Sequence, residues 1–314
     1  MNNEDLQLLH NSQMQTFELA RQNFAGLQQV VYKEIPFGTF SIRLQYNPAR
    51  ILSTNAKIDR QTLQNRPCFL CQHHLPAGQQ GIAYGNQYHI FVNPYPIFNR
   101  HFTVPAKIHT PQQIGPHFEN LLNMAFDFPG YTVFYNGPEC GASAPDHFHF
   151  QMVPRNLMPL EKDVQQTALR QIINQQDYYS ISVLRNYLRE VIVIQASDLQ
   201  LLSRLFTSVQ HVLGENIPFQ QEPMMNILTW FDNCQWTLCI FPRKLRRPRQ
   251  FFAEGEEKIL FSPGCVDMAG VIIAPRKEDF YRYSAPLLTD LFGQVSITPD
   301  CRNTIIQQLQ KIIL

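Results

Sequence analysis

Two histidines and a glutamine alternate in the segment His147-Phe148-His149-Phe150-Gln151. Side chains two apart along a strand point the same way, so we expect all three on one face of a strand over residues 147–153. The preceding loop is rich in small residues, which let backbone N–H groups approach phosphate oxygens. A neutral imidazole whose second nitrogen is held by a main-chain carbonyl can attack an α-phosphorus. The pattern therefore favours phosphoryl chemistry, although polar residues facing outward from an ordinary half-buried strand show the same spacing.

A pair of cysteines two residues apart lies in the segment Cys68-Phe69-Leu70-Cys71. Two thiolates at this spacing form half of a tetrahedral zinc site, which later histidines would complete. The same pair is equally typical of buried thiols that only pack in a core. The residues alone leave both interpretations open.

The densest basic cluster of the chain is the segment RKLRRPR, from Arg243 to Arg249. Arginine forks bind pairs of phosphate oxygens, so this segment could hold the phosphates of a substrate. By itself, such a cluster is more typical of a solvated turn.

The spacing of apolar residues predicts the elements that would position these side chains. In the first half it predicts one or two helices over 4–30, a strand pair over 33–45, strands at 88–92 and 101–105, a helix from Thr110 to about Phe126, and strands at 131–135 and 147–153. In the second half it predicts a polar helix over 160–175, a strand at 191–194, a helix over 199–213, strands at 225–231, 235–241 and 270–274, and a C-terminal helix. Each half contains a strand that runs into a turn of proline and basic residues, which is a weak indication of an ancient duplication.

Composition excludes several classes of protein. Of 314 residues, 44% are hydrophobic and only 16% are charged, which indicates a globular chain of about two domains. The 26 Lys and Arg residues balance 25 Asp and Glu residues, so no broad positive field for nucleic acid or an anionic membrane is expected. We identify no signal peptide and no apolar run of about 20 residues. Seven scattered cysteines favour a reducing cytoplasm over a disulfide scaffold.

Several segments together resemble the histidine-triad-like nucleotidyltransferases, the family that contains galactose-1-phosphate uridylyltransferase, diadenosine tetraphosphate phosphorylase and the GDP-hexose phosphorylases. The likeness is strongest to the GDP-hexose phosphorylases. Its segments occur in matching order: LQYNPAR at 44–50, FVNPYP at 91–96, YNG at 135–137, HFHFQ at 147–151 and MPLEK at 158–162. DMAGV at 267–271 and PRKEDF at 275–280 look like that family's closing strand and turn.

The resemblance implies an α+β fold with an antiparallel sheet of the histidine-triad type and flanking helices, in which two related halves are one option. It implies a catalytic half over residues 1–157 and a half over 158–314 that completes the substrate site. His149 would be the nucleophile and Gln151 would hold the phosphate, with His147 beside them in the catalytic group. The residues expected to bind substrate are Asn47, Arg50, Asn93, Asn136, Gly141, Ser143, Arg243 and Arg247.

The likeness to the uridylyltransferases adds an expectation about metal. It implies that a structural zinc ion is bound by Cys68, Cys71, His109 and His147. The GDP-hexose phosphorylases do not display this cysteine pair, so the chain combines features of two branches. No organic cofactor is expected.

The sequence therefore predicts a nucleotidyltransferase that releases a sugar 1-phosphate from a nucleoside-diphosphate sugar, with GDP-hexose as the first choice of substrate and phosphate as the acceptor. Phosphorolysis of a diadenosine polyphosphate and uridylyl transfer to a hexose 1-phosphate are alternatives at the same site. A zinc-stabilised module that binds nucleotides without catalysis is an alternative of another class. A homodimer is compatible with the sequence, whereas nucleic acid and membranes are not expected as partners.

Overall fold

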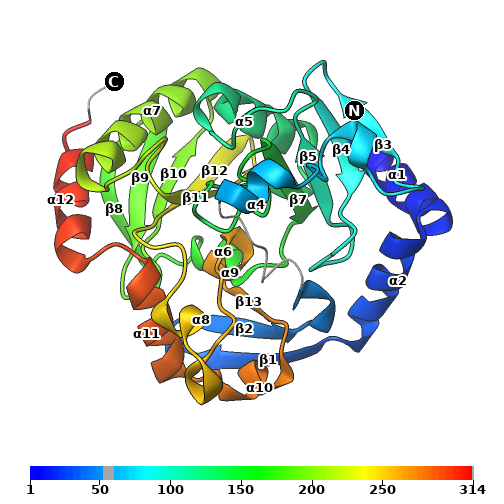
Figure 1. Ribbon diagram of the computed structural model, residues 1–314. Helices are drawn as coiled ribbons and strands as arrows, with labels where there is room; N and C mark the ends of the chain where they lie inside the picture. Colours follow the sequence, from blue (N-terminus) through cyan, green and yellow to red (C-terminus); the bar gives the residue numbers. More distant parts are fainter. Residues whose placement is uncertain (52–59, 313–314) are drawn as a thin grey trace.

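A computed structural model describes residues 1–51 and 60–312 of the chain. A ten-stranded antiparallel sheet dominates it, in the order β3-β4-β5-β7-β6-β11-β12-β10-β9-β8 (Figure 1). The strands of the first half are β3 (Gly81–Tyr84), β4 (Tyr88–Val92), β5 (Phe102–Pro105), β6 (Tyr131–Asn136) and β7 (His149–Pro154). Those of the second half are β8 (Arg170–Gln176), β9 (Tyr179–Leu184), β10 (Ile192–Ala196), β11 (Met225–Asp232) and β12 (Gln235–Pro242). The expected α+β fold with a large antiparallel sheet is confirmed.

The two halves of this sheet repeat one topology. In the first half, the meander β3-β4-β5 leads through helix α5 (Phe118–Asp127) to β6 and β7, and β7 lies between β5 and β6. In the second half, β8-β9-β10 leads through α7 (Leu199–Asn216) to β11 and β12, and β12 lies between β10 and β11. The halves join where β6 pairs with β11. The repeated strand order supports an origin by duplication.

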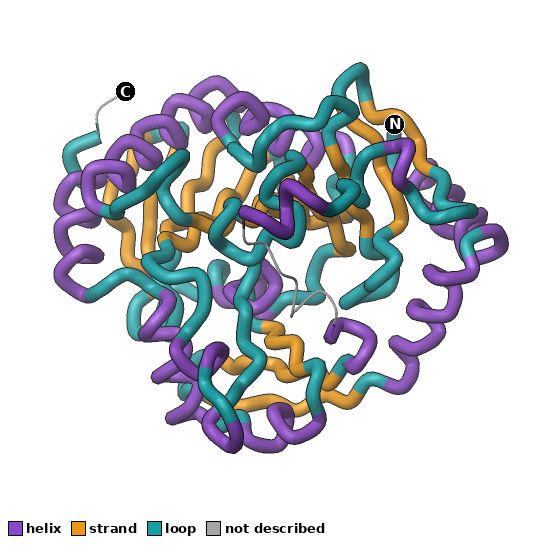
Figure 2. The backbone as a smooth tube through the Cα atoms, in the orientation of Figure 1, coloured by secondary structure: helices purple, strands orange, loops and turns teal. Residues whose placement is uncertain are grey.

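Helices cover one face of the sheet, as Figure 2 shows. The side chain of Asp198 caps α7 by accepting a hydrogen bond from the backbone N–H of Leu201, and the helix turns an apolar stripe toward the strands. With α5, α1 (Asn3–Thr16) and α12 (Pro299–Leu309), it encloses the first of two hydrophobic cores. Each leucine or phenylalanine that is fully buried here stabilises the fold by about 1.5–3 kcal/mol.

A second, smaller sheet lies on the other side of the large one. Strand β2 (Ser41–Tyr46) pairs antiparallel with β1 (Val31–Pro36) and parallel with β13 (Val271–Ala274). The layer is completed by α6 (Pro159–Asp163), α9 (Cys265–Met268), α10 (Lys277–Arg282) and α11 (Ala285–Val295), and it encloses the second core. Because β2 and β13 come from opposite ends of the chain, this layer ties the two halves together.

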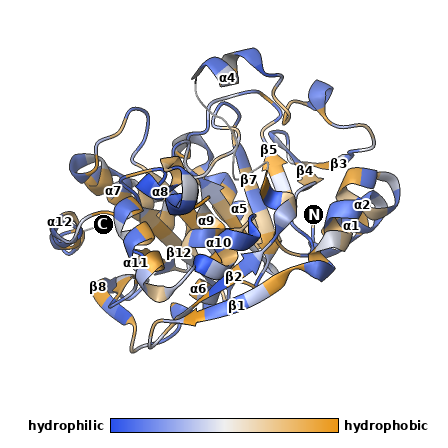
Figure 3. Cartoon of the chain, turned by 60° about the horizontal axis from the view of Figure 1, so that its bottom comes forward, coloured by the Kyte–Doolittle hydropathy of each residue, from blue (hydrophilic) through white to orange (hydrophobic). Residues whose placement is uncertain are grey.

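The remaining helices lie at the periphery. They are α2 (Glu18–Gly26), α4 (Arg60–Asn65) and α8 (Arg249–Phe252). Figure 3 shows apolar strands in the interior and more hydrophilic helices around them. Among the residues described, no helix has the length and apolar character needed to cross a bilayer.

Three of the expected elements are wrong in part. The helix expected from Thr110 begins at Phe118, because main-chain groups of Thr110, Gln112 and Ile114 are engaged in tertiary hydrogen bonds. The strand expected from His147 begins at His149, so His147 lies in the preceding turn. The polar helix expected over 160–175 is the short α6 followed by β8, whose polar character fits its position at the edge of the sheet.

Candidate active site

A cavity of about 420 Å³ opens beside the start of β7. It brings together most of the residues expected at the site, namely Arg50, Asn93, Asn136, Gly141, Ser143, His149, Gln151 and Arg247. Both halves of the chain contribute to its walls, because Ser262, Gly264 and Asp267 line it together with the residues of β6 and β7.

Two residues expected to bind substrate lie behind the cavity wall instead. The amide of Asn47 is buried and donates hydrogen bonds to the side chain of Gln45 and the carbonyl of Pro96, which ties β2 to the turn after β4. The guanidinium of Arg243 is fully buried and donates to main-chain carbonyls and to the side chain of Asn226. Asn226 in turn donates to Asn136, so Arg243 supports a residue that lines the cavity.

His149 has its two ring nitrogens in different surroundings. Nδ1 lies 2.9 Å from the main-chain carbonyl oxygen of His147. Since a carbonyl only accepts, Nδ1 carries the proton, and the lone pair of Nε2 is available to a ligand in the cavity. Burial lowers the pKa of His149 to about 4, against the opposing effect of that hydrogen bond, so the ring is neutral near pH 7.

Gln151 lies on the same face of β7 as His149, whereas Phe150 and Met152 point into the core under the helices. His101 fixes the direction of the Gln151 amide. The backbone N–H of Ile97 donates to Nδ1 of His101, so Nε2 carries the proton and donates to Oε1 of Gln151 over 2.8 Å. Burial lowers the pKa of His101 to about 3, which keeps its ring neutral. The NH₂ group of Gln151 is therefore free to donate to a substrate oxygen.

The loop between β6 and β7 packs closely against the second half of the chain. Gly141 has a φ of +95°, and a Cβ on it would lie 2.7 Å from the Cα of Gly264. Only glycine fits this position without displacing backbone. The side-chain oxygen of Asn136 accepts from the backbone N–H of Cys265 over 2.7 Å, so loops from both halves meet beside His149.

Arginines supply the positive charge of the cavity. Arg50 donates to the carbonyl of Tyr95, and Arg247 donates to Ser262 while its guanidinium lies 3.9 Å from the centre of the Phe251 ring. Burial, followed by repulsion from Arg246, lowers the pKa of Arg247 to about 10. Burial also lowers the pKa of Arg50 to about 10, so Arg50 and Arg247 remain charged near pH 7. Two neighbouring guanidinium groups that repel each other favour an anion beside them.

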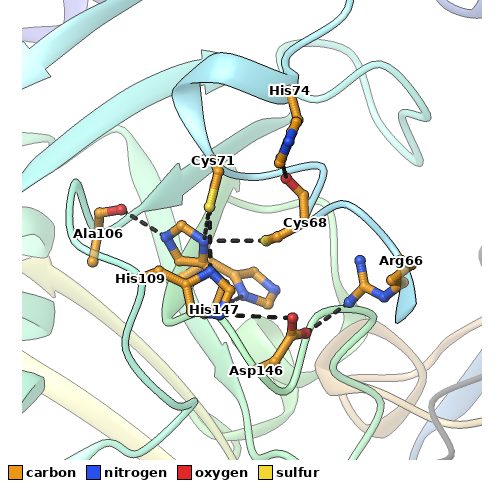
Figure 4. A network of polar contacts seen from close by, with 9 residues as sticks. Arg66, Cys68, Cys71, His74, Ala106, His109, Asp146 and His147 are labelled. Carbon is orange, nitrogen blue, oxygen red and sulfur yellow. Dashed lines mark hydrogen bonds and ion pairs between the residues drawn. The ribbon is translucent and has the colours of Figure 1, made fainter. Parts of the chain in front are cut away.

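Four thiol and imidazole groups form a cluster that can hold a metal ion: Cys68, Cys71, His109 and His147. Figure 4 shows how they converge from the cysteine loop, the segment after β5 and the turn before β7. The Nδ1 atom of His147 lies 3.3 Å from the sulfur of Cys68 and 3.5 Å from that of Cys71, whose sulfur lies 3.2 Å from Nδ1 of His109. These are the four residues that the resemblance selected.

Groups around this cluster orient its members. Nε2 of His147 lies 2.8 Å from the carbonyl oxygen of Ala106, which leaves Nδ1 as the ligating nitrogen. Nε2 of His109 lies 3.8 Å from a carboxylate oxygen of Asp146, whose other oxygen accepts from Arg66. A partner on the far side of each ring is the usual arrangement around a ligating histidine.

The cluster and the cavity share a stretch of chain. Phe69 and Leu70, the two residues between the cysteines, line the 420 Å³ cavity. A second, more open cavity of about 980 Å³ borders the cluster on the other side of the loop before β7. Arg246 lines both cavities.

Several residues of the site were missed from the sequence. Arg246 belongs to the same basic segment as Arg247, but the sequence did not show which arginines of that segment face the cavity. Asp267, whose pKa is raised to about 6 chiefly by burial, lies in a segment that the resemblance covers. His101 gave no signal, because it has no neighbour in sequence that marks its role.

Two family models match consecutive parts of the chain. A domain of unknown function, DUF4922, matches residues 9–154, and the GDPGP1-like C-terminal domain matches residues 163–313. None of the curated proteins matches the chain.

Solved structures of yeast Ap4A phosphorylase Apa2 are similar over almost the whole length of both chains. The complex with Ap4A has 15% identity and a TM-score of 0.60, with 95% of this chain and 98% of that chain covered. The complex with AMP has 16% identity and a TM-score of 0.59, with the same coverage. At this level of identity the likeness establishes a common fold.

Proposed function

Because the chain has the fold of the histidine-triad-like nucleotidyltransferases, we propose that it is a nucleotidyltransferase of the phosphorylase type with His149 as its nucleophile. The observation that carries this proposal is the state of His149. Its ring is neutral, its Nδ1 is held by the main chain, and the lone pair of Nε2 is available in a cavity lined by arginines.

The proposed reaction has two displacements at one phosphorus atom. Nε2 of His149 attacks the α-phosphorus of a nucleoside-diphosphate substrate, an N–P bond forms, and the bond to the bridging oxygen breaks with release of a sugar 1-phosphate. An oxygen of inorganic phosphate then attacks the same phosphorus, and the N–P bond breaks to restore the imidazole and give a nucleoside diphosphate. Covalent catalysis of this kind replaces one difficult displacement with two easier ones.

The surrounding groups would stabilise the charge that develops on phosphate. The NH₂ group of Gln151, oriented by His101, lies on the same strand face as His149 and can donate to an α-phosphate oxygen. Arg50 and Arg247 would bind the leaving phosphate, because planar guanidinium groups pair well with phosphate oxygens. Gly141 brings the loop backbone close enough for its N–H groups to take part.

We further propose that the cysteine and histidine cluster binds zinc in a structural role. With Zn–S near 2.3 Å and Zn–N near 2.0–2.1 Å, tetrahedral geometry requires sulfur and nitrogen atoms about 3.5 Å apart. The observed separations of 3.2–3.5 Å fit this requirement. Four protein ligands would leave no coordination position for substrate, so the metal would hold the loop rather than act on phosphorus.

GDP-hexose is the first choice of substrate. The sequence likeness to the GDP-hexose phosphorylases and the match of the second half to the GDPGP1-like family support it. A second candidate is phosphorolysis of a dinucleoside polyphosphate, which the likeness of the whole fold to Ap4A phosphorylase favours. The two differ in the leaving group, so the released product separates them.

The test is to incubate the purified protein with radiolabelled GDP-hexose, UDP-hexose and Ap4A, and to look for label bound to protein at alkaline pH, where a phosphoramidate is stable. We expect label on the wild type with one substrate, released by added phosphate, and none on His149→Ala. Release of sugar 1-phosphate supports the first choice of substrate, and release of ATP the second. Tight nucleotide binding without label on any substrate would instead favour the non-catalytic binding module.

A further inference from the structure

The hydrogen-bonded pairing of β6 with β7 ends next to His149. Strands β6 and β7 pair from Tyr131 and Pro154 to Phe134 and Gln151. Each antiparallel step moves one residue forward on one strand and one back on the other, so the next positions would set Asn136 opposite His149. In the part of the chain that the structure describes, no strand pairing joins these two residues.

The side-chain amide of Gln112 fills this break. Its Oε1 accepts from the backbone N–H of His149 over 2.8 Å. Its Nε2 donates to the backbone carbonyls of His149 and Asn136, each over 3.0 Å. The amide thus supplies the acceptor and donor that a neighbouring peptide group would supply in an unbroken ladder, and its side chain is fully buried.

Gln112 is itself held by its main chain. Its backbone N–H donates to the carbonyl of Pro145, and its backbone carbonyl accepts from the hydroxyl of Tyr135. The oxygen of the same hydroxyl is also hydrogen-bonded to the carboxyl group of Glu222, which accepts from the N–H of Ile114. The amide therefore has a fixed position between the strands.

We propose that Gln112 is a positioning residue that sets the distance between β6 and β7 and holds the main chain of His149, so that Nε2 faces the phosphorus. This inference rests on the proposed function. Both residues that the side-chain amide of Gln112 contacts, His149 and Asn136, line the substrate cavity, and Nδ1 of His149 depends on the carbonyl of His147 two residues away. Gln112 does not line the cavity, so its loss should change the rate of the covalent step rather than nucleotide affinity.

The experiment compares Gln112→Met, which keeps the volume and removes all three hydrogen bonds, with Gln112→Glu, which keeps the shape and the acceptor. The matched control is Asn174→Leu, because Asn174 lies on the edge strand β8, away from β6 and β7, and its amide also donates to main-chain carbonyls, near the C-terminus. Radiolabelled GDP-glucose measures the single-turnover rate of adduct formation, and GMP measures affinity.

We expect Gln112→Met to lower the single-turnover rate by about 10- to 100-fold, the effect of a small misplacement of a reacting group, with GMP affinity within about twofold of the wild type. Asn174→Leu should change neither. In Gln112→Glu, a protonated carboxyl restores one of the two donors of the amide, so its rate should recover in part as the pH falls relative to the wild type. A wild-type rate in Gln112→Met, or equal losses of rate and affinity, overturns the proposal.

A second readout keeps the inference separate from the proposed function. NMR of ¹⁵N-labelled histidine reports which nitrogen of His149 carries the proton. The wild type should show a single Nδ1–H form, and Gln112→Met should show exchange between forms. If no substrate labels the wild type, the proposed function fails, and this spectrum alone decides the role of Gln112: an unchanged spectrum refutes it. If Gln112→Met does not fold, Gln112→Glu provides the same comparison.

Discussion

The two hairpins at the centre of the large sheet have the same place in the repeated topology and opposite designs. Strands β11 and β12 pair along their whole length, from Met225 and Pro242 to Asp232 and Gln235, and a turn of two residues joins them. Strands β6 and β7 stop pairing at Phe134 and Gln151, and residues 137–148 join them. The closed hairpin, formed by β11 and β12, stabilises the sheet. The open hairpin, formed by β6 and β7, exposes strand ends that can carry chemistry. One repeat has thus kept the structural role while the other holds the candidate nucleophile.

The largest effect should come from removing the imidazole of the open hairpin. His149→Ala should lower nucleotidyl transfer by at least about 10⁴-fold, as expected when the nucleophile of a covalent mechanism is lost. Thr237→Ala, a truncation at a buried position of the closed hairpin, should leave the rate within about twofold. Steady-state release of sugar 1-phosphate from both variants measures this contrast. Comparable losses in the two variants would remove the functional distinction between the hairpins.

Loss of the metal should lower the local stability of the open hairpin and the loops beside it, and leave the rest of the sheet unchanged. Cys68→Ser removes one of the four proposed ligands, and we expect bound zinc to fall from about one ion per chain to less than about a tenth. Hydrogen exchange should become faster in residues 66–75 and 106–110 and stay unchanged in β8, β9 and β10. Metal analysis and exchange mass spectrometry on the same samples test this. Faster exchange throughout the second half would mean that the metal supports the whole fold.

The fold should lose stability as the pH rises, because the carboxyl of Glu222 is buried where the second half meets the open hairpin. Glu222, in the segment before β11, is hydrogen-bonded to Tyr135 of β6, and Cys140 is the other titratable group that faces it. Burial raises the pKa of Glu222 to about 7. Because the folded-state pKa lies above the unfolded one, this stabilisation is present at low pH and is lost as the pH rises through 7, with a total of about 3 kcal/mol.

Glu222→Gln tests this contact because the amide does not titrate. Between pH 5 and 8, its melting temperature should fall less than that of the wild type, since all other titrating groups are shared. Parallel curves for the two proteins would show that the carboxyl does not titrate in this range.

The smallest effect should come from the turn of the closed hairpin. Asn233 and Cys234 have φ values of +50° and +58°, the conformation of a type I′ turn, in which glycine is preferred at the second position. Cys234→Gly removes the steric cost of the left-handed conformation, but glycine also increases the conformational entropy of the unfolded chain. We therefore expect the free energy of unfolding to rise by about 0.5 kcal/mol. Thermal unfolding measures it, and nucleotidyl transfer should be unchanged.

Sequence patterns predicted the apolar strands better than the irregular segments, and the family resemblance selected the four residues of the cysteine and histidine cluster. The strand at 225–231 and the helix at 199–213 have strong periodicity, and both are present with shifts at their ends. The strand β8 was missed because its polar edge lacks that periodicity. Gln112 was assigned to a helix, since nothing in a local pattern shows that its amide bridges two distant strands. Arg243 was placed at the substrate because charge alone does not show that its partners are main-chain carbonyls.

Phe69 and Leu70 lie between two candidate metal ligands on one side and a substrate cavity on the other. Occupancy of one site should therefore change the binding affinity of the other, and the factor must be equal in both directions. A bound nucleotide would slow the escape of the ion to a chelator and shield both thiols from oxidants. Loss of the ion would weaken nucleotide binding by the same factor, which makes retention of the metal depend on the supply of substrate.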